Sequence, residues 1–167
     1  KTEDLAKLEE LEAKGKEIVD LTGLEFCTNL NKLNLDSNKI ADCTALSELN
    51  NLQKLSLNAN PIEDFSFLLT LSSIQELALH LTGLKDLSSF SNLTKLRYLN
   101  IGHNKIIDLA GISDCKELDN LILNSNGIED LEILKPIQNL PKLSAIHLSH
   151  NSFSNLDPFN MFDIVIF

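Results

Sequence analysis

The chain has 167 residues, of which 43% are hydrophobic and 23% charged, and a formal net charge of −10 at pH 7. This composition predicts one globular domain that needs no disulfide or metal for stability, and the negative charge disfavours direct nucleic-acid binding, which depends on clustered Lys and Arg. Since no apolar run approaches the roughly 20 residues that cross a bilayer, we expect no membrane insertion.

The first 29 residues are predicted to form an N-terminal cap followed by a degenerate copy of the repeat that fills the rest of the chain. Within residues 1–18, apolar side chains fall at the spacing of that repeat: Leu5, Leu8, Leu11, Ala13 and Ile18. The residues between them also fit a charged amphipathic helix that Gly15 would end: Glu9, Glu10, Glu12 and Lys14. We favour the helix as the cap, and a further repeat copy over these residues is the alternative.

Residues 30–153 contain six copies of one pattern. The first copy reads Leu-x-x-Leu-x-Leu-x-x-Asn-x-Ile, from Leu30 to Ile40. Four steps between copies are 22 residues and the last is 25, because the copies begin at Leu30, Leu52, Ile74, Leu96, Leu118 and Leu143. A repeat of this length predicts a solenoid of stacked turns.

Each copy combines a strand pattern with a return segment. The alternating leucines predict a short strand with one apolar face, which is buried only when neighbouring copies stack in a parallel sheet. We therefore expect one internal row made of Leu33, Leu55, Leu77, Leu99 and Leu121. The return segments are short and contain Pro61 and paired serines, which predicts 3₁₀ or single-turn helices.

Two polar positions recur with the repeat. The Asn that closes each strand suits a buried turn because it carries a donor and an acceptor, whereas Thr82 of the third copy offers only a hydroxyl, so we expect that copy to be less completely satisfied. Aspartates recur at Asp20, Asp42, Asp64, Asp86, Asp108 and Asp130. We interpret them as caps that accept backbone N–H bonds, with an acidic ridge for a basic partner as the alternative.

The chain leaves the pattern near its end. Pro136 and Pro141 bracket the three extra residues of the last step. Residues 154–167 finish in an apolar run, which predicts a C-terminal cap, or a truncated cap, that packs under the last copy. The whole of 1–167 is thus predicted to be a single domain.

The pattern resembles the leucine-rich repeat, and its 22-residue period resembles the class typified by the regulatory subunit of protein phosphatase-1. The stretch from Ile128 to Leu143 is similar to the last repeat of the acidic leucine-rich nuclear phosphoproteins and of the spliceosomal A-prime protein, and the stretch from Leu21 to Leu24 is similar to bacterial internalins. The resemblance implies an α/β fold: a right-handed solenoid with a concave parallel sheet, short 3₁₀ or single-turn helices on its convex side, and protein partners on the concave face.

The cysteines bear on location. Cys27, Cys43 and Cys115 stand at repeat positions that hold Leu or Phe in other copies, so all three are predicted core residues. Cys27 and Cys115 are four copies apart, which is too far for a disulfide. Free buried thiols favour a cytoplasmic or nuclear location, and an extracellular one is the alternative.

The strand residues between the leucines form the predicted binding face. Tyr98, the only tyrosine, is expected among Ala78, Ile122 and Leu81, an arrangement typical of an interface hot spot. The predicted partner-binding residues are Tyr98, His80, His103, Ile122, Leu81, Asn100 and His147.

No metal, cofactor or catalytic site is predicted. His147 lies two strands, about 10 Å, beyond the pair of His80 and His103, and no phosphate loop or convergent acid–base pair occurs. We expect a monomeric, non-enzymatic scaffold that binds a protein, as an adaptor or regulatory subunit. The alternatives are an extracellular bacterial internalin-like adhesin and an acidic nuclear regulator directed at histones or a phosphatase.

Overall fold

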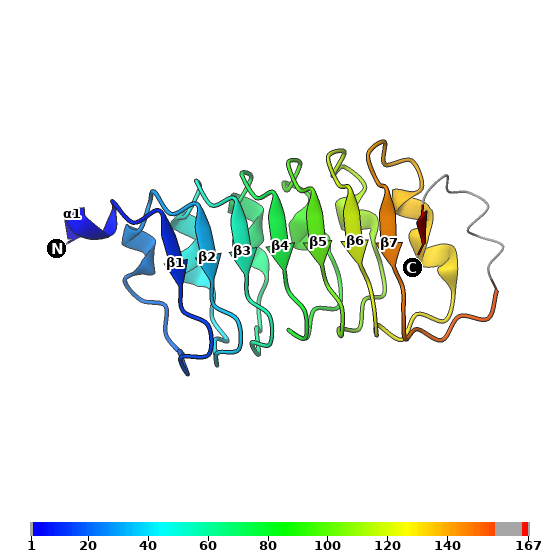
Figure 1. Ribbon diagram of the computed structural model, residues 1–167, viewed down its shortest axis with the longest axis horizontal. Helices are drawn as coiled ribbons and strands as arrows, with labels where there is room; N and C mark the ends of the chain where they lie inside the picture. The colour runs from blue at the N-terminus through cyan, green and yellow to red at the C-terminus, as the bar shows by residue number, and fades with distance from the viewer. Residues whose placement is uncertain (1, 156–164, 167) are drawn as a thin grey trace.

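A computed structural model describes residues 2–155 and 165–166, and its main feature is one parallel sheet. Eight strands follow each other in chain order, each paired with the next (Figure 1). They are β1 (Glu10–Glu12), β2 (Lys32–Asn34), β3 (Lys54–Ser56), β4 (Glu76–Ala78), β5 (Tyr98–Asn100), β6 (Asn120–Ile122), β7 (Ala145–His147) and β8 (Val165–Ile166). The predicted α/β solenoid with a parallel sheet is confirmed.

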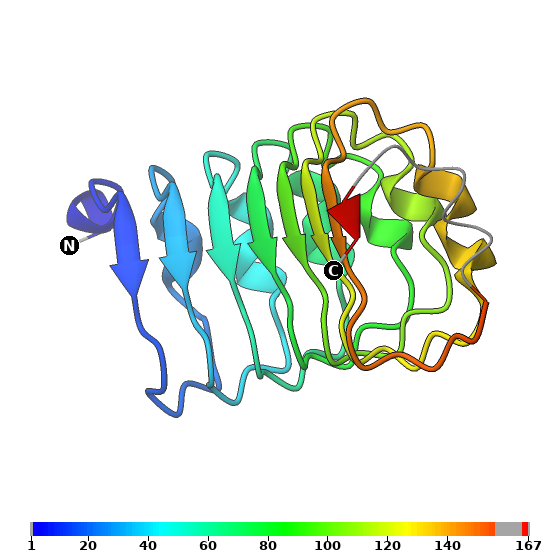
Figure 2. The ribbon, with the colours of Figure 1, turned by 45° about the vertical axis from the view of Figure 1, so that its right-hand side comes forward.

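Short 3₁₀ helices lie on the other side of the core from the sheet, as Figure 2 shows. They are η1 (Leu24–Phe26), η2 (Thr44–Glu48), η3 (Ser66–Thr70), η4 (Ser88–Phe90), η5 (Ala110–Ile112) and η6 (Leu131–Ile137). The one α-helix of the described residues, α1 (Thr2–Leu5), is a single turn. This confirms the predicted short return helices, which a 22-residue repeat requires because so little chain is left after strand and turns.

The core between these two layers consists of rows of buried apolar side chains, one residue from each repeat. Leu33, Leu55, Leu77, Leu99 and Leu121 are in direct register on successive strands and are at most 2% exposed, which confirms the predicted internal row. The 3₁₀ helices supply a second, fully buried row, made of Leu46, Leu68, Phe90, Ile112 and Leu134. Each repeat buries its apolar edge only against its neighbours, so stability depends on the stack as a whole.

The N-terminal prediction is wrong in one respect. The helix ends at Leu5, and Glu10–Glu12 form β1 instead of a helix that continues to Gly15. As a strand, this segment places Leu11 beside Leu33 and accepts backbone hydrogen bonds at the Glu9 carbonyl oxygen from two residues of the next repeat. A helix would leave those groups unpaired, so tertiary pairing outweighs the local helical preference.

Most of the predicted C-terminal cap lies outside the described residues. The exceptions are residues 154–155 and β8, whose backbone pairs with β7 in the same parallel register as the other strands.

Asparagine side chains tie consecutive repeats together. The Asn60 amide donates to the carbonyl oxygen of Leu57 in its own repeat, at 3.0 Å, and to that of Leu35 in the preceding repeat, at 2.9 Å. Its carbonyl oxygen accepts from the Ile40 N–H at 3.1 Å. A buried side chain with both functions can satisfy backbone groups of two repeats at once.

Thr82 weakens this link, as predicted. Its hydroxyl donates to Leu79 O in its own repeat at 2.8 Å, and among the described residues it makes no hydrogen bond to the preceding repeat. The Ile62 N–H, which an Asn at position 82 would engage, bonds within its own turn to Asn60 O instead. The joint between these two repeats therefore lacks side-chain bonds that the other joints have.

The aspartate column caps the return segments, which confirms that interpretation. Asp86 Oδ1 accepts from the backbone N–H of Ser88 at 3.0 Å and from its hydroxyl at 2.6 Å. Backbone N–H bonds of the same kind, at 2.8–2.9 Å, join the pairs Thr22–Asp20, Thr44–Asp42, Ser66–Asp64, Ala110–Asp108 and Glu132–Asp130. Each cap orients the chain as it enters its 3₁₀ helix or turn.

These caps predict acid sensitivity. Four of the carboxyls have a pKa below the ordinary value of 3.8. The largest cause is the hydrogen bond from a side-chain hydroxyl, and the backbone N–H adds to it. These carboxyls belong to Asp20, Asp42, Asp64 and Asp86. Because a lowered folded-state pKa contributes stability above the unfolded pKa, that contribution is lost as the pH falls below about 4. We expect Tm to fall between about pH 5 and pH 3, and to fall less in a variant with all four changed to Asn, whose amide oxygens cap at any pH. Equal falls in thermal melts of both proteins would contradict this prediction.

Candidate protein-binding face

The solvent side of the sheet is an open surface formed by the first and third residues of each strand. We call this surface the sheet face. Its neighbouring strands present side chains in direct register, because every pairing from β1 to β7 is parallel with a full repeat between partners. Side chains of the same repeat position therefore line up across the sheet.

Tyr98 lies on the sheet face at the start of β5 and is half-buried. Its register partners are Glu76 and Asn120, whereas Ala78 and Ile122 flank Asn100. Ala78 and Ile122 are therefore diagonal neighbours of Tyr98 on the two adjacent strands, two residues further along than its direct register partners. Burial raises the pKa of the Tyr98 hydroxyl, and a hydrogen bond with Asn100 opposes this shift.

The structure brings His80 and His103 together just beyond the carboxyl ends of β4 and β5. Their ring centroids are 4.6 Å apart, with the ring planes inclined by 57°. Burial and then the neighbouring His103 lower the pKa of His80, while the Asp36 carboxylate acts in the opposite direction. His80 therefore takes up its proton at a lower pH than an isolated histidine does.

Gly102 follows β5 beside these histidines and is buried. A Cβ at this position would lie 3.3 Å from His80 Nδ1, 3.3 Å from the Asn124 backbone oxygen and 3.4 Å from Asn100 Oδ1. Polar atoms of the neighbouring residues thus approach closely where other repeats carry a side chain, and the sequence signal for this was a glycine in that column.

The remaining predicted residues extend the same area. Ile122 and His147 are register partners on β6 and β7, and both are half-buried. Leu81 is 56% exposed at the edge, in the turn that follows β4. The seven predicted residues therefore form one continuous area from β4 to β7, which we call the aromatic half of the sheet face.

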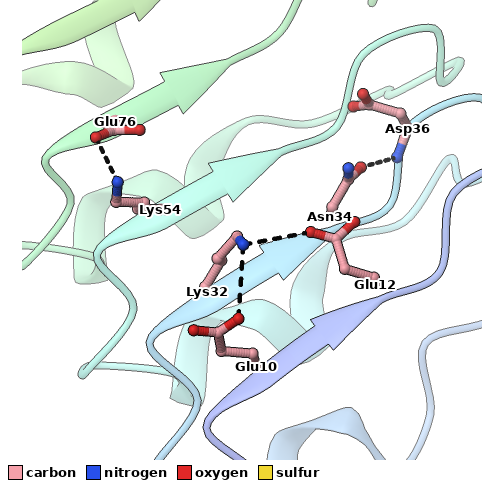
Figure 3. Close-up of polar contacts among 7 residues, drawn as sticks. All are labelled: Glu10, Glu12, Lys32, Asn34, Asp36, Lys54 and Glu76. Carbon is pink, nitrogen blue, oxygen red and sulfur yellow. Dashed lines mark hydrogen bonds and ion pairs between the residues drawn. The ribbon is translucent and has the colours of Figure 1, made fainter.

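The other half of the sheet face carries paired charges. Lys32 lies 3.5 Å from the carboxylate of Glu10 and 3.7 Å from that of Glu12, and Lys54 lies 2.7 Å from that of Glu76 (Figure 3). A shallow hollow of about 210 Å³ lies above these strands and reaches Tyr98. These half-exposed pairs contribute little to stability, and with three carboxylates against two lysines they leave this half slightly negative.

Asp36 anchors a polar network at the carboxyl ends of the strands. It is 9% exposed, and its Oδ1 accepts from the Ser56 hydroxyl at 2.6 Å and from the Asn58 N–H at 2.9 Å. Asn58 Oδ1 in turn accepts from the His80 N–H at 2.8 Å. Partly buried hydrogen bonds of this kind stabilise the turn that carries His80.

Sequence reasoning missed a backbone feature of this edge. In each repeat the third residue after the strand has a left-handed backbone, with φ between +52° and +59°. These residues are Ser37, Ala59, Leu81, His103, Ser125 and His150. Only the 22-residue spacing could have indicated this position, since its residues share no chemical type. The left-handed conformation turns Leu81 and His103 outward at the edge of the aromatic half.

No three His, Cys, Asp or Glu side chains in residues 2–155 and 165–166 are grouped so as to hold a metal ion. Cys27, Cys43 and Cys115 are buried and free, as predicted. Burial raises the pKa of Cys43 and Cys115 to about 12, so these two remain protonated thiols.

No helix in the described part of the chain has the length and apolarity to cross a bilayer.

Known proteins share this architecture. An internalin (inlF) of Listeria monocytogenes matches 96% of this chain with 33% identity and a TM-score of 0.88, and this chain spans 46% of it. Internalin C2 (inlC2) of the same species matches 99% of this chain with 29% identity and a TM-score of 0.74, and the chain spans 83% of it. A leucine-rich repeat protein of Leptospira interrogans matches 87% with 28% identity and a TM-score of 0.76, and 38% of it is spanned.

A family model agrees with these structures. Residues 28–70 match the model for two copies of the leucine-rich repeat. No curated protein sequence matches the chain. Proteins built from this repeat generally mediate protein–protein interaction. With six sequence copies stacked in one parallel sheet, the chain is a leucine-rich repeat protein.

Proposed function

We propose that the chain is a non-enzymatic scaffold that binds a protein partner through the aromatic half of its sheet face. Tyr98 is the observation that carries this proposal. A half-buried aromatic ring, held by its neighbours beside a hollow on an open face, loses little conformational freedom when a partner covers it. His80, Ile122 and Asn100 extend the same surface with apolar area and hydrogen-bonding groups.

The test is the substitution Tyr98→Ala, with Phe26→Ala as the matched control. Phe26 is an exposed aromatic on η1, on the opposite side of the solenoid. We expect a protein recovered with the wild-type chain to bind Tyr98→Ala at least about thirtyfold more weakly, the loss typical of a hot spot, and to bind Phe26→Ala unchanged in calorimetric titration. Equal affinity of that partner for all three proteins, with thermal melts that show each folded, would refute the proposed binding face.

A second candidate is an internalin-like bacterial binding protein that acts outside the cell. The likeness to the two Listeria internalins favours it, whereas the three buried free thiols favour a cytoplasmic or nuclear adaptor. An antibody against the chain, applied to intact and to lysed source cells with and without added protease, separates the two. Loss of the protein from intact cells supports the extracellular function, and protection until lysis supports the adaptor. The chain is proposed to act as a monomer in both cases.

A further inference from the structure

A second surface lies at the edge of the sheet, where β3, β4 and β5 pass into their turns. It is a groove of about 530 Å³. Its apolar wall consists of Ala59, Pro61 and the exposed side chain of Leu81. All charged or titratable side chains that line it are basic: Lys85, His103 and Lys105. In a chain with a net charge of −10, this groove is a local basic site with an apolar wall.

Lys105 has a counterpart elsewhere in the solenoid that shows what it lacks. Lys39 stands at the same repeat position, three copies earlier, and forms an ion pair with the Glu17 carboxylate of the preceding repeat. The backbones match, because the Lys39 N–H donates to Ile18 O and the Lys105 N–H donates to Leu84 O. The residue equivalent to Glu17 in the repeat before Lys105 is Gly83.

Gly83 leaves the place of that carboxylate empty. A Cβ added to it would have no heavy atom within 4 Å, so the space beside Lys105 is open. Within residues 2–155 and 165–166, neither Lys105 nor Lys85 lies within 4.0 Å of a carboxylate oxygen, although Lys85 also borders Glu63 in the adjoining turn. Lys105 therefore lacks the carboxylate partner that Glu17 provides for Lys39.

We propose that this groove takes an acidic side chain of the protein partner above Gly83, paired with Lys105, with an apolar side chain of the same partner segment against Leu81 and Pro61. The inference rests on the proposed function, because it assigns the chemistry of the partner at the edge of the aromatic half. A short acidic segment with one large apolar residue fits both walls of the groove, whereas an inorganic anion would leave the apolar wall uncovered.

The experiment titrates the ¹⁵N-labelled chain with synthetic peptides at low salt. The test peptide is acetylated and amidated and carries one phenylalanine between glutamates, and its twin carries glutamines in their place. We expect the glutamate peptide to shift the amide signals of Leu81, Gly83 and Lys105 and to bind about threefold to fivefold more tightly than its twin. Lys105→Gln should abolish this preference, and Lys95→Gln, an exposed lysine outside the groove, should preserve it.

A variant that supplies the missing carboxylate tests the same idea from within the chain. Gly83→Glu should pair with Lys105 as Glu17 pairs with Lys39. Glu17 adopts φ +59° at the same repeat position, so a glutamate can follow at Gly83, where φ is +84°, with the modest strain that a left-handed backbone imposes on a side chain. We expect this variant to stay folded and to lose the glutamate peptide.

Three results would overturn the proposal: equal binding of the two peptides, signal shifts away from the groove, or unchanged preference in Lys105→Gln. A dimer in sedimentation that Lys105→Gln dissociates would assign the groove to a second copy instead. Failure here is distinct from failure of the proposed function, since a partner that depends on Tyr98 but ignores Lys105 refutes only the groove, and the reverse result refutes only the binding face.

Discussion

Replacing Asn104 with alanine should lower the free energy of unfolding by about 3–5 kcal/mol, because several buried backbone groups would lose their partners at once. The side chain is 7% exposed. Its oxygen accepts from three N–H groups of the preceding repeat at 2.9–3.1 Å, those of Thr82, Gly83 and Leu84. Its amide donates at 2.8–3.1 Å to three carbonyl oxygens, those of Leu79, Ile101 and Gly102. Urea denaturation of the two proteins measures the difference.

The reverse substitution, at the joint where Thr82 stands in place of an asparagine, provides the control. Thr82→Asn should raise the free energy of unfolding by about 1 kcal/mol, because the new amide can donate to Leu57 O and accept from the Ile62 N–H, as Asn60 does with Leu35 and Ile40. If Asn104→Ala lowers the free energy of unfolding by less than about 1 kcal/mol, or if Thr82→Asn lowers it at all, the asparagine side chains do not hold the repeats together through these hydrogen bonds.

Replacing Gly111 with alanine should destabilise the chain by at least about 3 kcal/mol, because the new methyl group would overlap the backbone of the preceding repeat. Gly111 is in η5, and an added Cβ would collide with the carbonyl carbon and oxygen of Leu87. Backbone atoms cannot move aside as a flexible side chain can, so η5 would have to separate from the repeat before it. Thermal and urea unfolding both measure this loss.

Gly127 is the matched control for this prediction. An added Cβ there has no heavy atom within 4 Å, and the cost arises only from its left-handed backbone, with φ +70°. Gly127→Ala should therefore cost about 1 kcal/mol. If the two alanine variants unfold at the same urea concentration, the close approach of η5 to Leu87 is not important for stability.

The repeat spacing predicted the fold because each copy has the same pattern of apolar residues. Leu33 and Leu55 are both buried and in register for the reason that the sequence indicates: a period of two within a strand and of 22 between strands leaves one arrangement that covers every leucine. The aspartate caps were predictable for a similar reason, since Asp86 and Ser88 interact over two residues and need no knowledge of the rest of the chain.

The candidate site was predicted less well. The order of side chains along a strand placed Tyr98 on the sheet face, but whether Ala78 or Glu76 faces it depends on the register between strands. The outward turn at Leu81 depends on a left-handed backbone that leucine itself disfavours and that the stacked repeats impose. The segment Glu10–Glu12 shows the same limit, because its charges suit a helix and its neighbour makes it a strand.

Local and periodic information in the chain was thus sufficient for the stacked solenoid, its buried leucine rows and its caps, because those features follow from spacing alone. The empty place above Gly83 and the unpaired Lys105 emerged only from the folded chain, because both depend on residues one repeat apart and on how their side chains point. Packing between repeats determines these features, and the sequence of a single repeat does not.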